Sequence, residues 1–194
     1  VLTAWREEEG DILAFLPGVG EIERVRERLE ARLPEVPVLL LHGQVEPAMQ
    51  RAAIRRDPQG RRRIVLASAI AETSITLEGV SVVVDSGLSR RAEYDRAAGT
   101  THLVTHRASQ AAATQRAGRA ARQGPGVAYR LWEEGGHKGR PRFDPPEIET
   151  ADLAPLVLKT DLWGSGDPAA LPWLDPPPEA SLGAARQKLG GLGA

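Results

Sequence analysis

Short apolar runs alternate with helix-like stretches along most of this chain. The apolar runs occupy residues 11–16, 36–41, 64–67, 80–85 and 126–132, and stretches of helical character fill 21–33 and 46–56 between them. Strands that are apolar throughout are typical of a parallel sheet with helices on both faces, because neither side of such a strand meets water. The pattern therefore predicts an α/β fold built on a parallel sheet.

Two further segments follow the fourth apolar run. Residues 87–105 lack a helical pattern, and the GTTHLV segment within them predicts a β-hairpin that turns near Ala98 and Gly99. A helix is expected over 109–122, with Ser109 as its N-cap and Gly124 just past its end.

The texture of the chain changes near residues 135–146, which are rich in Gly, Pro and charge, as a linker would be. Beyond them we expect one helix over 147–163, a Pro-rich loop over 171–178 and a last helix from Glu179. The expected division is a first domain over 1–142, followed by a linker and an incomplete, mostly helical second domain over 143–194.

Composition excludes several classes of protein. The 194 residues include no cysteine, which excludes a disulfide scaffold and thiolate metal sites, and the four histidines show no ligand spacing, so we expect no metal site. No apolar run approaches the roughly 20 residues of a membrane span and no signal peptide opens the chain, so we expect a cytoplasmic protein with no membrane partner. The formal net charge of -1 means that any contact with nucleic acid must come from local placement of charge.

Unusual segments follow four of the predicted strands, at residues 16–18, 41–44, 67–74 and 85–90. Since ligands of open parallel sheets bind beyond the carboxyl ends of the strands, these segments should line one edge. Their small and hydroxyl residues leave backbone N–H groups open to phosphate oxygens. Ordinary β–α turns also favour Gly and Ser, and for any single loop that explanation is the better one.

The segment QRAGRAAR, residues 115–122, concentrates arginine on the predicted helix. Gln115, Arg119 and Arg122 lie at i, i+4 and i+7 and so share one stripe, whereas Arg116 points elsewhere. A solvated face usually interleaves Glu with Arg, but no acidic residue occurs between Ser109 and Glu133. The stripe therefore indicates that an anion approaches it, and two arginines one turn apart are suited to the charge of a transferring γ-phosphate.

Four ordered motifs resemble one family. QRAGRAAR resembles the QRxGRxGR signature of superfamily 2 helicases, and ASAIAETSIT resembles the TNIAETSLT segment of their DEAH/RHA branch. FLPG and DSGLSR are similar to two further family segments, the predicted hairpin occupies the place of that branch's β-hairpin, and WLDPPP resembles the start of its winged-helix domain. The chain looks most like the bacterial HrpB-type helicases. This resemblance implies a RecA-like (P-loop NTPase-type) helicase C-terminal domain followed by a partial winged-helix segment.

The resemblance also implies roles for individual residues at a nucleotide. Arg119 and Arg122 would reach the γ-phosphate, and Gln115 would help to place the attacking water or a phosphate. Glu78 matches an acidic position near the ribose, and Gly87 belongs to a segment near the nucleotide.

Single-stranded RNA is the implied nucleic-acid partner, held by its backbone at four positions: Gly18, Gly43, Ser68 and Thr73. Three substitutions depart from the family pattern. Ala121 replaces a usual Gly, Ser68 replaces a usual Thr but keeps a hydroxyl, and Ala69 replaces a usual Asn and so loses an amide donor. No aromatic residue is evident for stacking on adenine. For the basic run over 55–63, a solvated turn is slightly favoured over a contact with nucleic acid.

Neither a GxxxxGK[ST] loop nor a DEAH box occurs in the chain. In the family these belong to the first RecA-like lobe, which would hold ATP with Mg²⁺ and would be the partner of this chain. We therefore expect that the chain alone does not hydrolyse ATP and that the full protein is an ATP-dependent RNA helicase. Two alternatives stay open: a non-enzymatic module that binds RNA or a protein, and a superfamily 2 translocase that acts on DNA.

Overall fold

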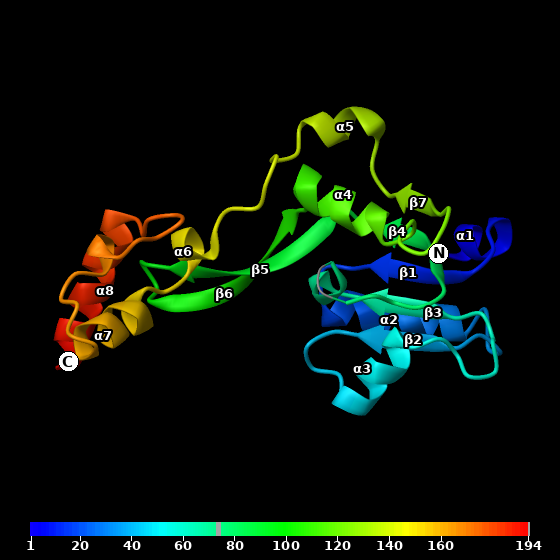
Figure 1. Ribbon diagram of the computed structural model, residues 1–194, viewed down its shortest axis with the longest axis horizontal. Coiled ribbons are helices and arrows are strands. Elements are labelled where there is room, and N and C mark those ends of the chain that lie inside the picture. The colour runs from blue at the N-terminus through cyan, green and yellow to red at the C-terminus, as the bar shows by residue number, and fades with distance from the viewer. Residues whose placement is uncertain (73–74, 194) are drawn as a thin grey trace. The chain divides into compact units, whose positions relative to one another are not determined.

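The computed structural model describes residues 1–72 and 75–193 (Figure 1). The chain divides into two compact units, one made of Val1–Arg90 and Thr105–Asp144, the other of Arg91–Val104 and Pro145–Ala194. Each unit is described by itself below.

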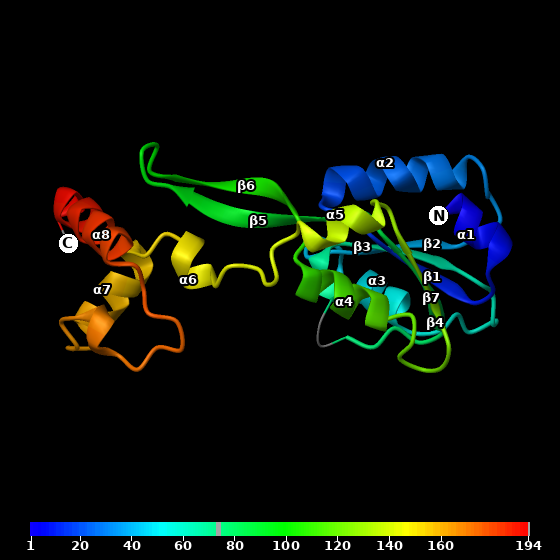
Figure 2. The same cartoon turned by 90° about the horizontal axis from the view of Figure 1, so that it is seen from above.

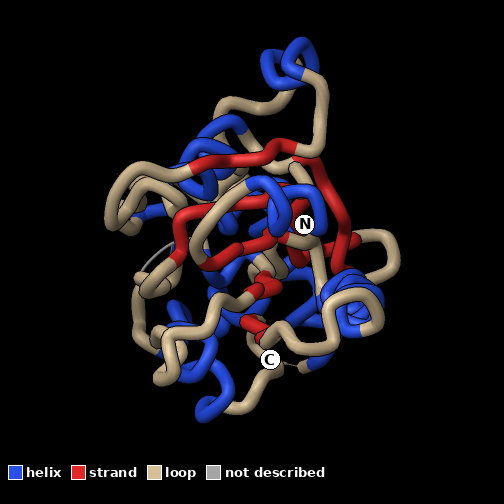
Figure 3. Tube along the Cα trace, turned by 90° about the vertical axis from the view of Figure 1, so that its right-hand side faces the viewer, coloured by secondary structure: helices blue, strands red, loops and turns tan. Residues whose placement is uncertain are grey.

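The first unit is built on a five-stranded sheet. Its strands are β1 (Asp11–Phe15), β2 (Val38–Leu41), β3 (Ile64–Ala67), β4 (Val80–Asp85) and β7 (Val127–Arg130). They lie in the order β2-β3-β1-β4-β7, and every neighbouring pair is parallel. The predicted α/β fold with a parallel sheet is confirmed, and Figure 3 distinguishes its strands from the helices and loops that join them.

Helices cover both faces of this sheet (Figure 2). On one face, Ile12 and Ala14 of β1 belong to a core cluster with Ile22 and Leu29 of α2 (Val19–Glu30), to which α1 (Leu2–Glu7) adds Ala4. Alternate residues of a strand point to opposite faces, so the neighbours of these two β1 residues enter a second core.

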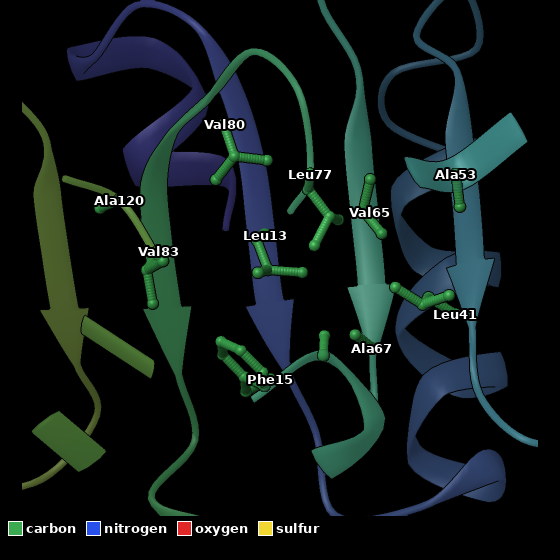
Figure 4. Packing of buried hydrophobic residues seen from close by; sticks show 11 residues of the cluster. Leu13, Phe15, Leu41, Ala53, Val65, Ala67, Leu77, Val80, Val83 and Ala120 are labelled. Atoms are coloured by element: carbon green, nitrogen blue, oxygen red, sulfur yellow. The ribbon is translucent and has the colours of Figure 1, made fainter. Parts of the chain in front are cut away.

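The second core lies on the side of α3 (Pro47–Ile54) and the segment after α4 (Gln110–Gly118). Leu13 and Phe15 pack there with Ala53 of α3 and with Ala120 (Figure 4). Pro47 starts α3 at a position where its missing N–H costs nothing. Strands buried on both faces explain why the sequence shows continuous apolar runs rather than alternation.

A buried ion pair at the amino edge of the sheet joins the first residue of β1 to the residue that precedes β3. The Nε of Arg63 lies 2.8 Å from Oδ2 of Asp11, and its Nη1 and Nη2 donate to the carbonyls of Ala52 (2.8 Å) and Glu78 (3.0 Å). Arg63 is 1% exposed. Its neighbour Arg62 lies 3.9 Å over the ring of Trp5. These two arginines of the basic run at 55–63 therefore hold the fold.

The predicted hairpin is present as β5 (Leu88–Asp95) and β6 (Thr100–Arg107), which form a two-stranded sheet. Oδ1 of Asp95 accepts hydrogen bonds from the backbone N–H groups of Ala97 (2.8 Å) and Ala98 (3.1 Å). Gly99 completes the turn with a φ of 66°, a conformation that glycine adopts without strain. The turn lies where the sequence predicted it.

The second unit contains α6 (Glu147–Thr150), α7 (Ala154–Leu162), a 3₁₀ turn, η2 (Pro168–Ala170), and α8 (Glu179–Leu192). The single helix expected over 147–163 is wrong: Ala151 is extended, Oδ1 of Asp152 accepts from the N–H of Ala154 (3.0 Å), and Pro155 lies in the first turn of α7. Helices α7 and α8 share a small core. The last helix begins at Glu179 as predicted.

Two short helices, α1 and α5 (Glu134–Lys138), were not expected from the sequence. The second overlaps the start of the stretch over 135–146 that was expected to be a linker. Neither is long enough to show a periodic apolar face.

We predict that Asp11→Ala destabilises the chain by about 3–5 kcal/mol, because it leaves the buried guanidinium of Arg63 without its counter-charge. Urea unfolding followed by circular dichroism measures the change. The matched control is Glu23→Ala, which breaks the more exposed pair with Arg26 and should cost less than about 1 kcal/mol. Equal losses for the two variants would contradict this account of the amino edge.

Candidate nucleotide and nucleic-acid interface

The four segments that follow β1, β2, β3 and β4 lie at one edge of the sheet. All four strands are parallel and adjacent, so their carboxyl ends face the same way. The placement of these loops on one edge, expected from the sequence, is confirmed for the described residues. After β3 the chain enters a 3₁₀ turn, η1 (Ala69–Ala71), which begins directly after Ser68.

The residues expected to meet a nucleic-acid backbone are placed unequally along this edge. Gly43 is exposed, and a Cβ built on it would meet nothing within 4 Å. Ser68 is half-buried on the adjacent loop, with its N–H bonded to the carbonyl of Leu41 at 3.2 Å. Gly18 is buried at the N-cap of α2, where a Cβ would lie 2.5 Å from Nη1 of Arg90. Thr73 lies outside the described residues.

The arginine-rich helix is shorter than expected. Ser109 is the predicted N-cap, and its Oγ accepts from the N–H of Ala112 at 3.1 Å. The helix α4 ends at Gly118, however, so Arg122 lies in the turn beyond it and the single helix over 109–122 is wrong. Glycine is a weak helix residue, and the chain must turn here towards β7: a Cβ on Gly126 would lie 2.1 Å from the carbonyl oxygen of Ala120.

The four polar residues of QRAGRAAR differ in their exposure to solvent. Gln115 and Arg122 are exposed, whereas Arg119 is 7% exposed and Arg116 is 1% exposed. Position along the segment therefore separates side chains that face solvent from side chains that hold the protein together.

Arg119 rests on backbone carbonyls. Its guanidinium donates to the carbonyl of Glu72, with a distance of 3.0 Å from Nε, and also to the carbonyl of Ile75. Burial lowers the pKa of Arg119, and the nearby positive charge of Arg122 lowers it further. A guanidinium stays charged in proteins all the same. Among residues 1–72 and 75–193 no carboxylate forms an ion pair with it.

Arg116, which the sequence stripe left aside, is the most strongly bonded of the set. It forms ion pairs with Glu72 (2.6 Å) and Asp85 (2.8 Å), the acids that follow β3 and end β4. Burial lowers the pKa of Arg116, but the two carboxylates outweigh that effect and raise it overall. Burial also raises the pKa of Glu72, and the attraction of Arg116 only partly offsets the rise. The signal for this pairing was present in the sequence: two acids at the carboxyl edge and an arginine off the stripe.

Glu78 lies in the loop before β4. Its Oε2 accepts from the backbone N–H of Arg56 at 3.2 Å. The next residue, Gly79, donates its N–H to Oε1 of Gln123 at 3.0 Å. That bond brings the loop of Glu78 to the turn that carries Arg122.

Gly87 has a structural reason to be glycine. Its φ is 71°, and a Cβ would lie 2.5 Å from both Arg140 and the ring of Trp132. Its N–H donates to Oδ1 of Asp85 at 2.8 Å, and its carbonyl accepts from Arg140 at 2.7 Å and from Ala108. Both polar backbone groups are used within the protein, so a contact between Gly87 and a nucleotide stays a prediction.

Within the described ranges, 1–72 and 75–193, no group of three or more His, Asp or Glu side chains is arranged to hold a metal ion. In the same ranges no helix is long and apolar enough to cross a bilayer.

The chain is similar in sequence to known proteins. Residues 1–124 match the family model of the helicase conserved C-terminal domain. The chain is 46% identical over 190 residues to the ATP-dependent RNA helicase HrpB of Escherichia coli K12, covering 97% of this chain and 24% of that protein. It is 40% identical over 179 residues to the human probable ATP-dependent RNA helicase DHX34, covering 91% of this chain and 16% of that protein.

A solved structure is also similar to this chain. A crystal structure of the E. coli DEAH/RHA helicase HrpB superposes with a TM-score of 0.93 at 45% identity, and covers 99% of this chain and 25% of that one. The chain thus spans about a quarter of the length of HrpB. With its parallel sheet, its arginine-bearing edge and a family match over most of its length, the chain belongs to the helicase conserved C-terminal domain family.

Proposed function

We propose that this chain is the second motor lobe of a longer ATP-dependent RNA helicase and that it supplies arginines to ATP held by another lobe. One observation carries the proposal. Three arginines lie within seven residues, and only Arg116 has carboxylate partners among the described residues, whereas Arg119 has carbonyls and Arg122 is exposed. Two guanidinium groups that form no ion pair with any described residue attract an anion.

A γ-phosphate is the anion that fits this arrangement. Arg119 and Arg122 are close enough for the charge of one to lower the pKa of the other. Transferring phosphoryl groups spread negative charge over three oxygens, and arginine donors stabilise that charge. To reach such oxygens, Arg119 exchanges the carbonyls of Glu72 and Ile75 for phosphate. Gln115, which is exposed on α4, is proposed to orient a water or a phosphate.

The nucleotide itself would be held mainly by the other lobe. The chain contains no phosphate-binding loop of the GxxxxGK[ST] type and no DEAH box, so ATP and Mg²⁺ need a partner surface. HrpB, of which this chain matches 24%, has ample length for such a lobe. The loop of Glu78, joined to the turn of Arg122 through Gly79 and Gln123, supports a role for Glu78 near the ribose.

The loops after β2 and β3 are proposed to carry the RNA backbone. Gly43 leaves open space above its backbone, and Ser68 presents a hydroxyl on the neighbouring loop. Such groups contact sugar and phosphate and carry no base preference. The relatives named as RNA helicases support RNA as the strand. Gly18 and Thr73 belong to the same proposal, as does a winged-helix start within 143–194.

In the full-length protein, we expect Arg119→Ala and Arg122→Ala each to reduce RNA-stimulated ATP turnover by about 10³-fold or more, since arginine fingers contribute on that scale. Steady-state phosphate release measures it. Arg28→Ala, which removes an exposed arginine of α2, is the control and should leave turnover unchanged. A loss of less than about tenfold in both finger variants would refute the assignment.

Gly43→Asp should weaken binding of a single-stranded oligoribonucleotide by roughly tenfold, because a carboxylate then faces the phosphates. Fluorescence anisotropy at two salt concentrations measures the affinity. The matched control, Gln59→Asp, adds the same charge in the turn before β3, at the opposite edge of the sheet. Equal weakening by both variants would contradict the placement of the RNA at the loop of Gly43.

A further inference from the structure

The side chain of Arg116 forms a clasp, defined here as Arg116, Glu72 and Asp85. Nε and Nη2 of the guanidinium donate to Oε1 of Glu72 at 2.8 and 2.6 Å, and Nη1 donates to Oδ1 of Asp85 at 2.8 Å. Nη1 also donates to the carbonyl of Leu88 at 3.0 Å. One buried side chain of α4 therefore ties together the loop after β3 and the segment after β4.

Glu72 connects this clasp to the arginine proposed to reach ATP. Its carboxylate is held by Arg116, and its backbone carbonyl accepts from Nε of Arg119 at 3.0 Å. The two arginines, which sit three positions apart, thus grip the same residue by different groups. Glu72 is therefore held from two sides, by Arg116 at its carboxylate and by Arg119 at its carbonyl.

The clasp residues make further contacts with the protein around them. The guanidinium carbon of Arg116 lies 5.1 Å from the ring centroid of Phe15, at the carboxyl end of β1. Oδ1 of Asp85 also accepts from the N–H of Gly87, at 2.8 Å. A planar fork that meets two carboxylates and a carbonyl in fixed directions has little freedom, and lysine could not reproduce it. A side chain must be held in one conformation in this way if it is to fix the geometry of neighbouring residues.

We propose that Arg116 and Glu72 are positioning residues for Arg119. They set the starting position of the Arg119 guanidinium, so that it meets the γ-phosphate when the nucleotide-holding lobe approaches, and Arg116 itself does not touch the nucleotide. The inference rests on the proposed function, since it presupposes that Arg119 acts on ATP. It also implies that Glu72 and the arginine segment keep a fixed geometry relative to each other.

The test uses the full-length protein with ATP and a single-stranded oligouridylate. Glu72→Gln keeps the shape of the side chain but removes its charge, and Arg116→Lys keeps the charge but removes the fork. For each we expect the RNA-stimulated kcat to fall by about 10- to 100-fold, the size of effect that a misplacement of about 1 Å produces. The KM for ATP should stay within about twofold of its starting value, because the lost interaction belongs to the transition state.

Two further measurements separate positioning from mere stability. Arg62→Ala removes an arginine that also donates to backbone carbonyls, at the amino edge; it should lower the melting temperature and leave kcat unchanged. In an Arg119→Lys background, Arg116→Lys should reduce kcat by less than about threefold further, because residues that act through one another are not additive.

Loss of kcat in both clasp variants, with non-additivity against Arg119→Lys, supports the inference. A lowered melting temperature with kcat unchanged, or full additivity with Arg119→Lys, overturns it while the proposed function stands, provided that Arg119→Ala abolishes turnover. Full turnover in Arg119→Ala overturns the proposed function and this inference together.

Discussion

The buried charge of Arg116 is the interaction on which the functional edge depends. Its guanidinium, 1% exposed, meets carboxylates from two different segments, one after β3 and one at the end of β4. Breaking such a pair by removing one partner typically costs about 3–5 kcal/mol, because a charge is left buried without a counter-ion. The loops at the carboxyl edge are therefore attached to the sheet by electrostatics as well as by packing.

The arginines of the first unit divide into those that hold the fold and those that are available to a ligand. Arg63 at the amino edge and Arg116 at the carboxyl edge each satisfy a buried carboxylate. Arg122, in contrast, is exposed, and the acceptors of Arg119 among residues 1–72 and 75–193 are carbonyls. A near-neutral chain can thus present a local positive site without a basic surface overall, because Arg63 and Arg116 are neutralised by buried carboxylates.

The sequence predicted the sheet, the hairpin and the gathering of loops on one edge, because each depends on local pattern: continuous apolar strands, the Ala98–Gly99 turn and parallel connection. It did not predict where α4 ends. The spacing of Gln115, Arg119 and Arg122 implies a continuous helix, but the helix ends at Gly118. The close approach of Gly126 to Ala120, which turns the chain there, is a tertiary contact that the local spacing does not reveal. The break near Asp152 was missed for a similar reason. The apolar spacing runs across it, whereas Asp152 accepts a hydrogen bond from the N–H of Ala154, where a new helix begins.

Individual side chains were harder to place than elements. Arg116 was set aside because it lies off the stripe, although that is what directs it into the protein towards Glu72 and Asp85. Gly87 was assigned to the nucleotide, while the structure supplies a packing reason for it against Trp132 and Arg140. The sequence contained the two acids and the off-stripe arginine, but their pairing across 31 and 44 residues depends on the assembled sheet.

The central claim is that the arginines of this chain act on ATP held by another lobe. Its most direct test compares ATP hydrolysis, with and without single-stranded RNA, by the chain alone, by the chain mixed with the upstream lobe of the full protein, and by the intact protein. The account predicts no turnover by the chain alone and RNA-stimulated turnover whenever the upstream lobe is joined to it. Hydrolysis by the chain alone, or none in the intact protein, would contradict it.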